Sequence, residues 1–236
     1  MENIAVVGSA GSIGGAMVEL LRQKYPKAQL SLMARACVEA TDPQITSYNI
    51  DLLDEESIEI ASSQIDAPLD FVFVATGMLQ NDKVRPEKSL RDLSAENFLR
   101  LFHVNTIGPA LLAKHFLPKL SQNSRSVFAT LSARVGSIHD NRLGGWYGYR
   151  ASKAALNMVV KSASIEMARK NKNAIIVGLH PGTVDSPLSK PFQGNVPEGK
   201  LFSADYAAKK LLAVVENLKQ NQTGGVYAWD GRPIPY

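Results

Sequence analysis

The chain has 236 residues, of which 45% are hydrophobic and 20% charged, so it can bury one sizeable core and fits a single domain over residues 1–236. No run of about 18 apolar residues is present, which excludes a transmembrane helix, and the first residues lack the features of a secretory signal. The net charge of +4 is spread along the chain and Cys37 is the one cysteine, so we expect a cytoplasmic enzyme or binding protein without a disulfide framework, a metal site, or affinity for nucleic acid or membranes.

Segments of strand length alternate with longer segments of helical spacing. In chain order the pattern predicts a strand over 4–7, a helix over 12–23, strands over 30–33 and 45–50, a helix capped by Asp54 and running to 64, a strand over 71–75, a helix over 94–120 with a bend near Gly108 and Pro109, a strand over 127–131, a helix over 149–170, a strand over 175–179, a helix of about 17 residues capped by Ser203, and a strand over 226–229. This alternation predicts an α/β fold of the Rossmann type, a doubly wound parallel sheet of about seven strands with helices on both faces.

A glycine-rich loop joins the first predicted strand to the first predicted helix. Glycines let the backbone approach a pyrophosphate, and the start of a helix offers unpaired N–H groups and positive potential. We therefore expect a dinucleotide to bind here; the alternative is a tight turn without a ligand. The residues of this site are Gly8, Ser9, Gly11, Ser12, Ile13 and Gly14.

The second predicted strand is followed by Arg35, at a point where sites for NAD usually carry an acidic residue. A guanidinium matches a 2′-phosphate through paired hydrogen bonds. The position therefore favours NADP(H) over NAD(H), and the alternative is a solvated arginine on a loop.

Tyr149 and Lys153 are four residues apart at the start of a predicted helix, so they share one face. A tyrosine titrates near pH 10 and exchanges protons poorly at neutral pH. An ammonium group about 4 Å away would lower the pKa of the phenol toward the useful range for general acid–base catalysis. The alternative is a packed aromatic ring beside a solvated lysine.

Together with further motifs, this pair makes the chain resemble the short-chain dehydrogenase/reductase family over nearly its whole length. The stretches 134–138, 144–147 and 149–157 resemble the C-factor-like branch of that family. The other motifs that carry the resemblance are Gly8, Gly11 and Gly14, Asp51 after the third strand, Ala75, Thr76 and Gly77 after the fourth, Asn105, Ser132 after the fifth, and Pro181, Gly182 and Thr183 after the sixth.

The resemblance implies roles for these residues. Tyr149 would be the general acid in reduction and the base in oxidation, while Lys153 would lower its pKa and hold the nicotinamide ribose. Asn105 would hold a water that relays protons. The remaining positions would contact the cofactor: Asp51 and Leu52 at the adenine, Ala75, Thr76 and Gly77 at the adenosine ribose, and Pro181, Gly182, Thr183 and Val184 at the nicotinamide.

The family also places a serine at the substrate oxygen, three residues before a glycine. Counting back from Gly136 reaches Ala133, so Ser132 stands one residue early and would point to the opposite face of a strand. A bulge at the strand end could restore Ser132 to this role. We expect Ser132, with Ser137 or no hydroxyl at all as the alternatives.

The implied activity is that of an NADP(H)-dependent oxidoreductase, which transfers a hydride between nicotinamide and a small-molecule carbonyl or alcohol. A cofactor-binding regulatory or cell-signalling protein with vestigial catalysis is the alternative, and a sugar-nucleotide epimerase is less favoured because its substrate domain is longer. The loop 186–201 is expected to be a lid over the substrate. The resemblance further implies a homodimer or homotetramer assembled through the long helices.

Overall fold

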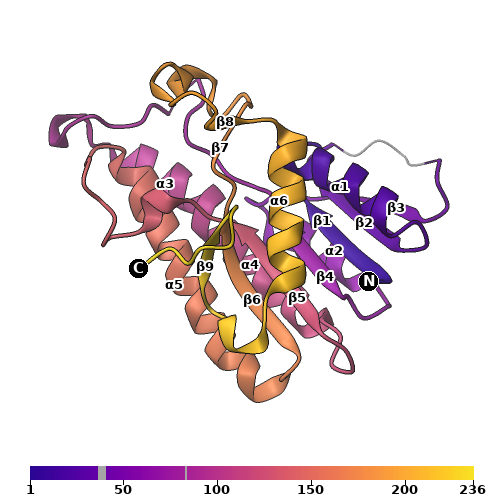
Figure 1. Ribbon diagram of the computed structural model, residues 1–236. Coiled ribbons are helices and arrows are strands. Elements are labelled where there is room, and N and C mark those ends of the chain that lie inside the picture. The colour runs from indigo at the N-terminus through magenta and orange to yellow at the C-terminus, as the bar shows by residue number, and fades with distance from the viewer. Residues whose placement is uncertain (37–40, 83) are drawn as a thin grey trace.

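Seven strands, every neighbouring pair of which is parallel, form the central sheet of the computed structural model, which describes residues 1–36, 41–82 and 84–236 (Figure 1). The predicted doubly wound parallel sheet is thereby confirmed. Cys37 lies outside the described residues. In spatial order the strands are β3 (Ile45–Asn49), β2 (Gln29–Ala34), β1 (Asn3–Val7), β4 (Phe71–Val74), β5 (Ser126–Leu131), β6 (Ala174–His180) and β9 (Val226–Ala228).

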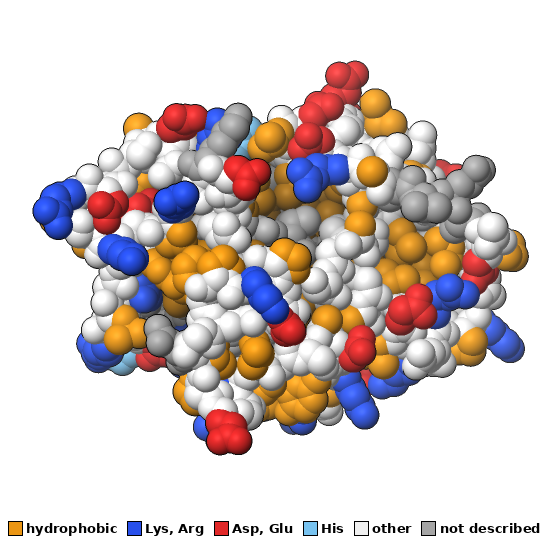
Figure 2. Space-filling model, turned by 90° about the horizontal axis from the view of Figure 1, so that it is seen from above, with side chains coloured by type: hydrophobic (Ala, Val, Ile, Leu, Met, Phe, Trp, Pro, Cys, Tyr) orange, Lys and Arg blue, Asp and Glu red, His pale blue; other side chains and the backbone are white. Residues whose placement is uncertain are grey.

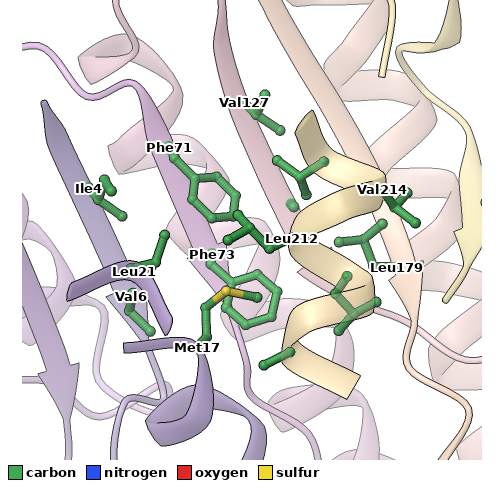
Figure 3. Close-up of a cluster of buried hydrophobic side chains, with 14 of the residues drawn as sticks. Ile4, Val6, Met17, Leu21, Phe71, Phe73, Val127, Leu179, Leu212 and Val214 are labelled. Atoms are coloured by element: carbon green, nitrogen blue, oxygen red, sulfur yellow. The ribbon is translucent and has the colours of Figure 1, made fainter. Parts of the chain in front are cut away.

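Helices cover both faces of the sheet because its central strands are apolar on both sides. Along β1, Ile4 and Val6 face one hydrophobic cluster, and Ala5 and Val7 face the other. Helices α1 (Ser12–Lys24) and α6 (Ala204–Asn217) pack into the first cluster (Figure 3). Helices α2 (Glu55–Ser63), α4 (Gly108–Phe116) and α5 (Tyr147–Lys170) pack into the second. Helices therefore pack on both faces of the sheet, as the sequence pattern predicted.

The predicted helix starts are supported by capping hydrogen bonds. The side chain of Asp54 accepts a hydrogen bond from the backbone of Glu56, and Ser203 accepts one from Tyr206. Such caps satisfy N–H groups that have no partner within the first turn. The helix that Ser203 caps ends at Asn217, slightly earlier than predicted.

The helix predicted over 94–120 is divided by a π-helical turn. Helix α3 (Ala95–Phe102) leads into this turn, η2 (His103–Ile107), and α4 continues from Gly108. The irregularity therefore lies one turn before the expected bend at Gly108 and Pro109. A π turn frees backbone groups from the regular helical pattern and is often found at functional sites.

The carboxyl ends of all seven strands meet at one edge of the sheet, the upper edge in Figure 1. The strand order reverses between β1 and β4, and such a reversal opens the crevice in which doubly wound sheets bind ligands. Figure 2 looks down on this edge and shows a hollow near its centre with hydrophobic side chains gathered in and around it. A short parallel pair that the sequence did not reveal, β7 (Thr183–Val184) and β8 (Leu201–Phe202), stands above it. No helix in the described part of the chain is long and apolar enough to cross a membrane.

Candidate active site

The glycine loop between β1 and α1 is packed so closely that side chains cannot replace two of its glycines. A Cβ on Gly14 would lie 2.1 Å from the carbonyl oxygen of Gly8, and one on Gly8 would lie 3.0 Å from that of Ala75. Gly8 also has a φ of +81°, which favours glycine. Within the described loop 8–14, α1 starts after Gly11 without a side-chain cap. The start of α1 therefore faces the crevice with N–H groups suited to an anion.

Polar atoms beside this loop fit a dinucleotide. The hydroxyl of Thr76, which follows β4, is buried and has no hydrogen-bond partner among the described residues. Asp51, which follows β3, accepts a hydrogen bond from the backbone of Leu53, and Leu52 packs against Gly108. Arg35 follows β2 and is exposed. The expected cofactor residues of β1, β2, β3 and β4 thus all lie at the carboxyl edge of the sheet.

The expected nicotinamide segment follows β6 on the other side of the crevice. Gly182 has a φ of +79°, and a Cβ there would lie 2.6 Å from the ring of Phe202. Thr183 and Val184 form β7, and the pairing of β7 with β8 holds this segment in place. Pro181 begins the turn that leads into it.

Tyr149 and Lys153 lie four residues apart on the first turns of α5, and both are buried, with exposed fractions of 9% and 2%. The ammonium of Lys153 donates a hydrogen bond to the carbonyl oxygen of Leu131 at 2.9 Å. Burial lowers the pKa of Lys153 to about 7 and raises the pKa of Tyr149 to about 12. The shift of the phenol pKa is thus opposite to the one expected from Lys153, because desolvation dominates in this arrangement.

Asn105 occupies the π turn and connects three elements. Its side chain accepts a hydrogen bond from the backbone N–H of Met78 and donates to the carbonyl of Met78, both at 2.8 Å. It also donates to the hydroxyl of Ser152 on α5 at 3.1 Å. A Cβ on Gly77 would lie 3.6 Å from the Lys153 nitrogen and 3.7 Å from Asn105 Oδ1. The structure therefore brings Gly77, Asn105 and Lys153 together.

The two candidate serines are both engaged elsewhere. Ser132 donates its hydroxyl hydrogen to Asn157 Oδ1 on α5 at 2.6 Å. Ser137 accepts a hydrogen bond from the backbone N–H of Asp140. The residue that packs in one hydrophobic cluster with Tyr149 is Ala133. In this structure the hydroxyl expected at the substrate thus faces Asn157, eight residues beyond Tyr149 on α5, while the next residue, Ala133, packs with Tyr149.

The surroundings of the Tyr149 ring are hydrophobic. Trp146 lies 6.3 Å from the Tyr149 ring and 5.0 Å from the ring of Phe192, measured between ring centroids. Phe192 belongs to the loop 186–201, so this loop packs against the cluster that contains the tyrosine. The cluster comprises Leu79, Val84, Leu101, Ala133 and Tyr149, with Met78, Val135, Trp146, Leu188 and Phe192 packed against it.

The roles of Glu87 and Asn157 at the site were not anticipated from the sequence, whereas His180 was expected to border the pocket. The buried carboxylate of Glu87 accepts a hydrogen bond from the backbone of Gly148 at the start of α5. Asn157 receives the hydroxyl of Ser132. Burial lowers the pKa of His180 to about 4, with the Arg134 charge as a smaller cause, and His180 Nδ1 has no partner among the described residues. No sequence signal marked Glu87, and Asn157 belongs to the stretch 149–157 but had no role assigned, because polar residues in loops and helices are usually solvated.

Comparison with known proteins agrees with this geometry. A family model described as short chain dehydrogenase matches residues 2–196. The 1-hydroxy-2-glutathionyl-2-methyl-3-butene dehydrogenase of Rhodococcus sp. is 30% identical over 185 residues, which are 77% of this chain and 76% of that protein. The C-signal protein of Myxococcus xanthus is 31% identical over 63% of this chain and 84% of its own. The NADPH-bound carbonyl reductase from chicken fatty liver has the same fold, with a TM-score of 0.83 and 22% identity over 100% of this chain and 99% of that one.

The buried lysine makes stability depend on pH. Lys153 has a pKa of about 7 in the folded protein, below its value of 10.5 when exposed, so between these values the unfolded chain binds the extra proton. The free energy of unfolding should therefore rise with pH across this window, by up to about 1.4 kcal/mol per pH unit from this one group. In urea titrations at pH 7 to 10, the free energy of unfolding of the parent should rise relative to that of Lys153→Met, which lacks the titrating group. A difference independent of pH would contradict the burial of a neutral amine.

Proposed function

The chain belongs to the short-chain dehydrogenase family, and from this membership we propose that it is an NADP(H)-dependent oxidoreductase that interconverts a carbonyl compound and its alcohol. The observation that carries the proposal is the burial of Tyr149 and Lys153 on α5, beside Gly77 and Asn105 at the crevice. A relative of the C-factor type was expected from the sequence, and the similarity to C-signal bears this out.

Tyr149 would act as the general acid in reduction. The phenol is neutral at physiological pH and carries the proton that the substrate oxygen needs, while burial raises its pKa and opposes the release of that proton in the free protein. Bound NADP(H) would supply the hydride to the carbonyl carbon, or accept it in the reverse direction. In oxidation the tyrosine would take the proton from the alcohol instead.

Lys153 and Asn105 would return the proton to Tyr149. With a pKa of about 7, Lys153 can give and accept a proton near neutral pH. Asn105 fixes the loop after β4 against α5, and the resemblance to the family assigns it a relay water. Their position beside Gly77 supports a path from solvent to the tyrosine.

The cofactor would lie across the reversal of strand order. The glycine loop and the start of α1 suit its pyrophosphate, the unpartnered hydroxyl of Thr76 suits a ribose, and Asp51 suits the adenine. Arg35 is exposed after β2, where it can pair with a 2′-phosphate. The NADPH held by the carbonyl reductase of the same fold supports this preference for NADP(H).

The substrate would be a mainly apolar carbonyl or alcohol, since the cluster around Tyr149 is hydrophobic. Residues 186–201 would form its lid, with Leu188 and Phe192 as the side chains that close over the site. The lid would open to admit the substrate, because Leu188 and Phe192 pack against the cluster that contains Tyr149.

A regulatory role is the second candidate, and two observations favour it. The C-signal relative is named for signalling, and both candidate serine hydroxyls are engaged away from the site. A protein of this kind would bind NADP(H) without turnover that depends on Tyr149.

We also propose that the chain forms a homodimer through α3, α4 and α5. Met158 and Ile165 are seven residues apart on α5 and are exposed, and Leu99 and Ile107 are exposed on the adjoining α3 and π turn. Burying such residues against a second copy is favourable, since each removes apolar area from water.

Removing the tyrosine hydroxyl tests the enzymatic proposal. Tyr149→Phe should lower kcat by about 10²- to 10⁴-fold, because the general acid is lost. The affinity for NADPH, measured by fluorescence titration, should stay within about threefold since the aromatic ring is retained. Equal turnover of parent and variant across a panel of carbonyl compounds would favour the regulatory alternative.

Removing the guanidinium tests the cofactor preference. Arg35→Ala should weaken NADPH binding by about 10- to 100-fold, the usual effect of losing hydrogen bonds to a charged group. Binding of NADH, measured by the same titration, should change by less than about threefold, because NADH lacks the phosphate. An equal loss of affinity for NADPH and NADH would contradict the pairing of Arg35 with the 2′-phosphate.

A charge on the exposed face of α5 tests the dimer. Met158→Asp should shift the mass measured by light scattering from two chains to one, because a buried unpaired carboxylate is costly. Leu143→Asp is the control, since Leu143 is 92% exposed on a loop outside these helices. A parent protein that is monomeric, or a Met158→Asp variant that remains dimeric, would contradict the proposed dimer through these helices.

A further inference from the structure

The segment that follows strand β5 directs a methyl group, and no hydroxyl, toward Tyr149. Ala133 is buried in the cluster that contains the Tyr149 ring. Ser132 lies on the other side, where its Cβ would be 3.4 Å from a Cβ placed on Gly178 of β6. The two residues therefore face opposite ways, as neighbours in extended backbone do.

The hydroxyl of Ser132 has its one hydrogen committed. It donates that hydrogen to Asn157 Oδ1 at 2.6 Å, and Asn157 Nδ2 reaches the carbonyl of Gly136 at 3.4 Å. All three residues are buried. Turning the hydroxyl toward a substrate would leave the amide oxygen of Asn157 unpaired inside the protein, which is costly.

We propose that the substrate oxygen is held by the Tyr149 hydroxyl without a second hydroxyl from β5, that Ser132 is a positioning residue for α5, and that the site therefore favours carbonyls activated by an adjacent electron-withdrawing group, such as apolar 1,2-diketones. This inference rests on the proposed reductase function. It names the substrate class of the same site.

The substrate preference follows from the charge that develops during reduction. The carbonyl carbon gains a hydride with both electrons from NADPH, which becomes NADP⁺, and the oxygen gains the proton of Tyr149, so a diketone becomes a hydroxyketone. Losing one hydrogen-bond donor at such an oxygen typically slows a reaction about 10²- to 10³-fold. A neighbouring carbonyl withdraws electrons from the reacting centre, so a diketone depends less on that donor.

Two ketones that differ only in the adjacent carbonyl test the inference, 1-phenylpropane-1,2-dione and 1-phenylpropan-1-one, each with NADPH. The parent should reduce the dione with much the larger kcat/KM. Ala133→Ser should raise kcat/KM for the monoketone by about 10- to 100-fold and for the dione by less, because it adds the missing donor. Ala133→Cys is the size-matched control, since a thiol is a weak donor, and it should leave the ratio of the two values unchanged.

Removal of the existing hydroxyl provides a second and independent measurement. Ser132→Ala should lower kcat/KM for both ketones by the same few-fold factor, with an unchanged pH profile, because positioning affects both substrates alike. Asn157→Ala should reproduce this loss, and the double variant should be no worse than either single one, since the two residues act as one unit.

Particular results would overturn the inference. If Ser132→Ala reduces turnover of the monoketone about 100-fold or more and increases the preference for the dione, Ser132 itself holds the substrate oxygen. This result decides the question even if Ala133→Ser fails to fold, as judged by its thermal unfolding. A parent that prefers the monoketone would also contradict the inference while leaving the reductase function intact. A parent that reduces neither ketone, nor any other carbonyl, would instead overturn the proposed function and the inference with it.

Discussion

Close packing between the end of strand β5 and helix α5 holds the candidate site together. A Cβ on Gly136 would lie 2.8 Å from the carbonyl carbon of Lys153, so the two backbones are nearly in contact. Lys153 donates a hydrogen bond to the carbonyl oxygen of Leu131, and Ser132 donates one to Asn157 Oδ1 across the same interface. These ties fix α5 against the carboxyl edge of the sheet, and the orientation of every side chain on the first turns of α5 depends on them.

The same packing sets the protonation of the site. Desolvation disfavours both charged forms, so it raises the pKa of Tyr149 and lowers the pKa of Lys153. The spacing of four residues was enough to place both groups on one face of a helix. It could not reveal which effect dominates, because burial depends on Ala133 and Phe192, which come from other parts of the chain.

The fold was largely predictable, because continuous apolar segments such as Phe71–Val74 identify strands buried on both faces. The π turn at His103–Ile107 was not, since its residues are compatible with a regular helix and only tertiary contacts select the wider turn. β7 and β8 have two residues each, too few for any periodicity. The direction of Ser132 depends on whether β5 ends in a bulge, and the alternation of neighbouring side chains persists there instead.

In the proposed reaction, Tyr149 exchanges a proton with the substrate beside a bound nicotinamide. A titration of the protein with ¹³C-labelled tyrosine, followed by NMR with and without NADP⁺, tests it most directly. Tyr149 should titrate near 12 in the free protein and at a clearly lower pH with NADP⁺ bound, because a positive charge nearby stabilises the phenolate. An identical Tyr149 titration in the two states, with NADP⁺ binding verified, would contradict the proton exchange by Tyr149 beside the nicotinamide.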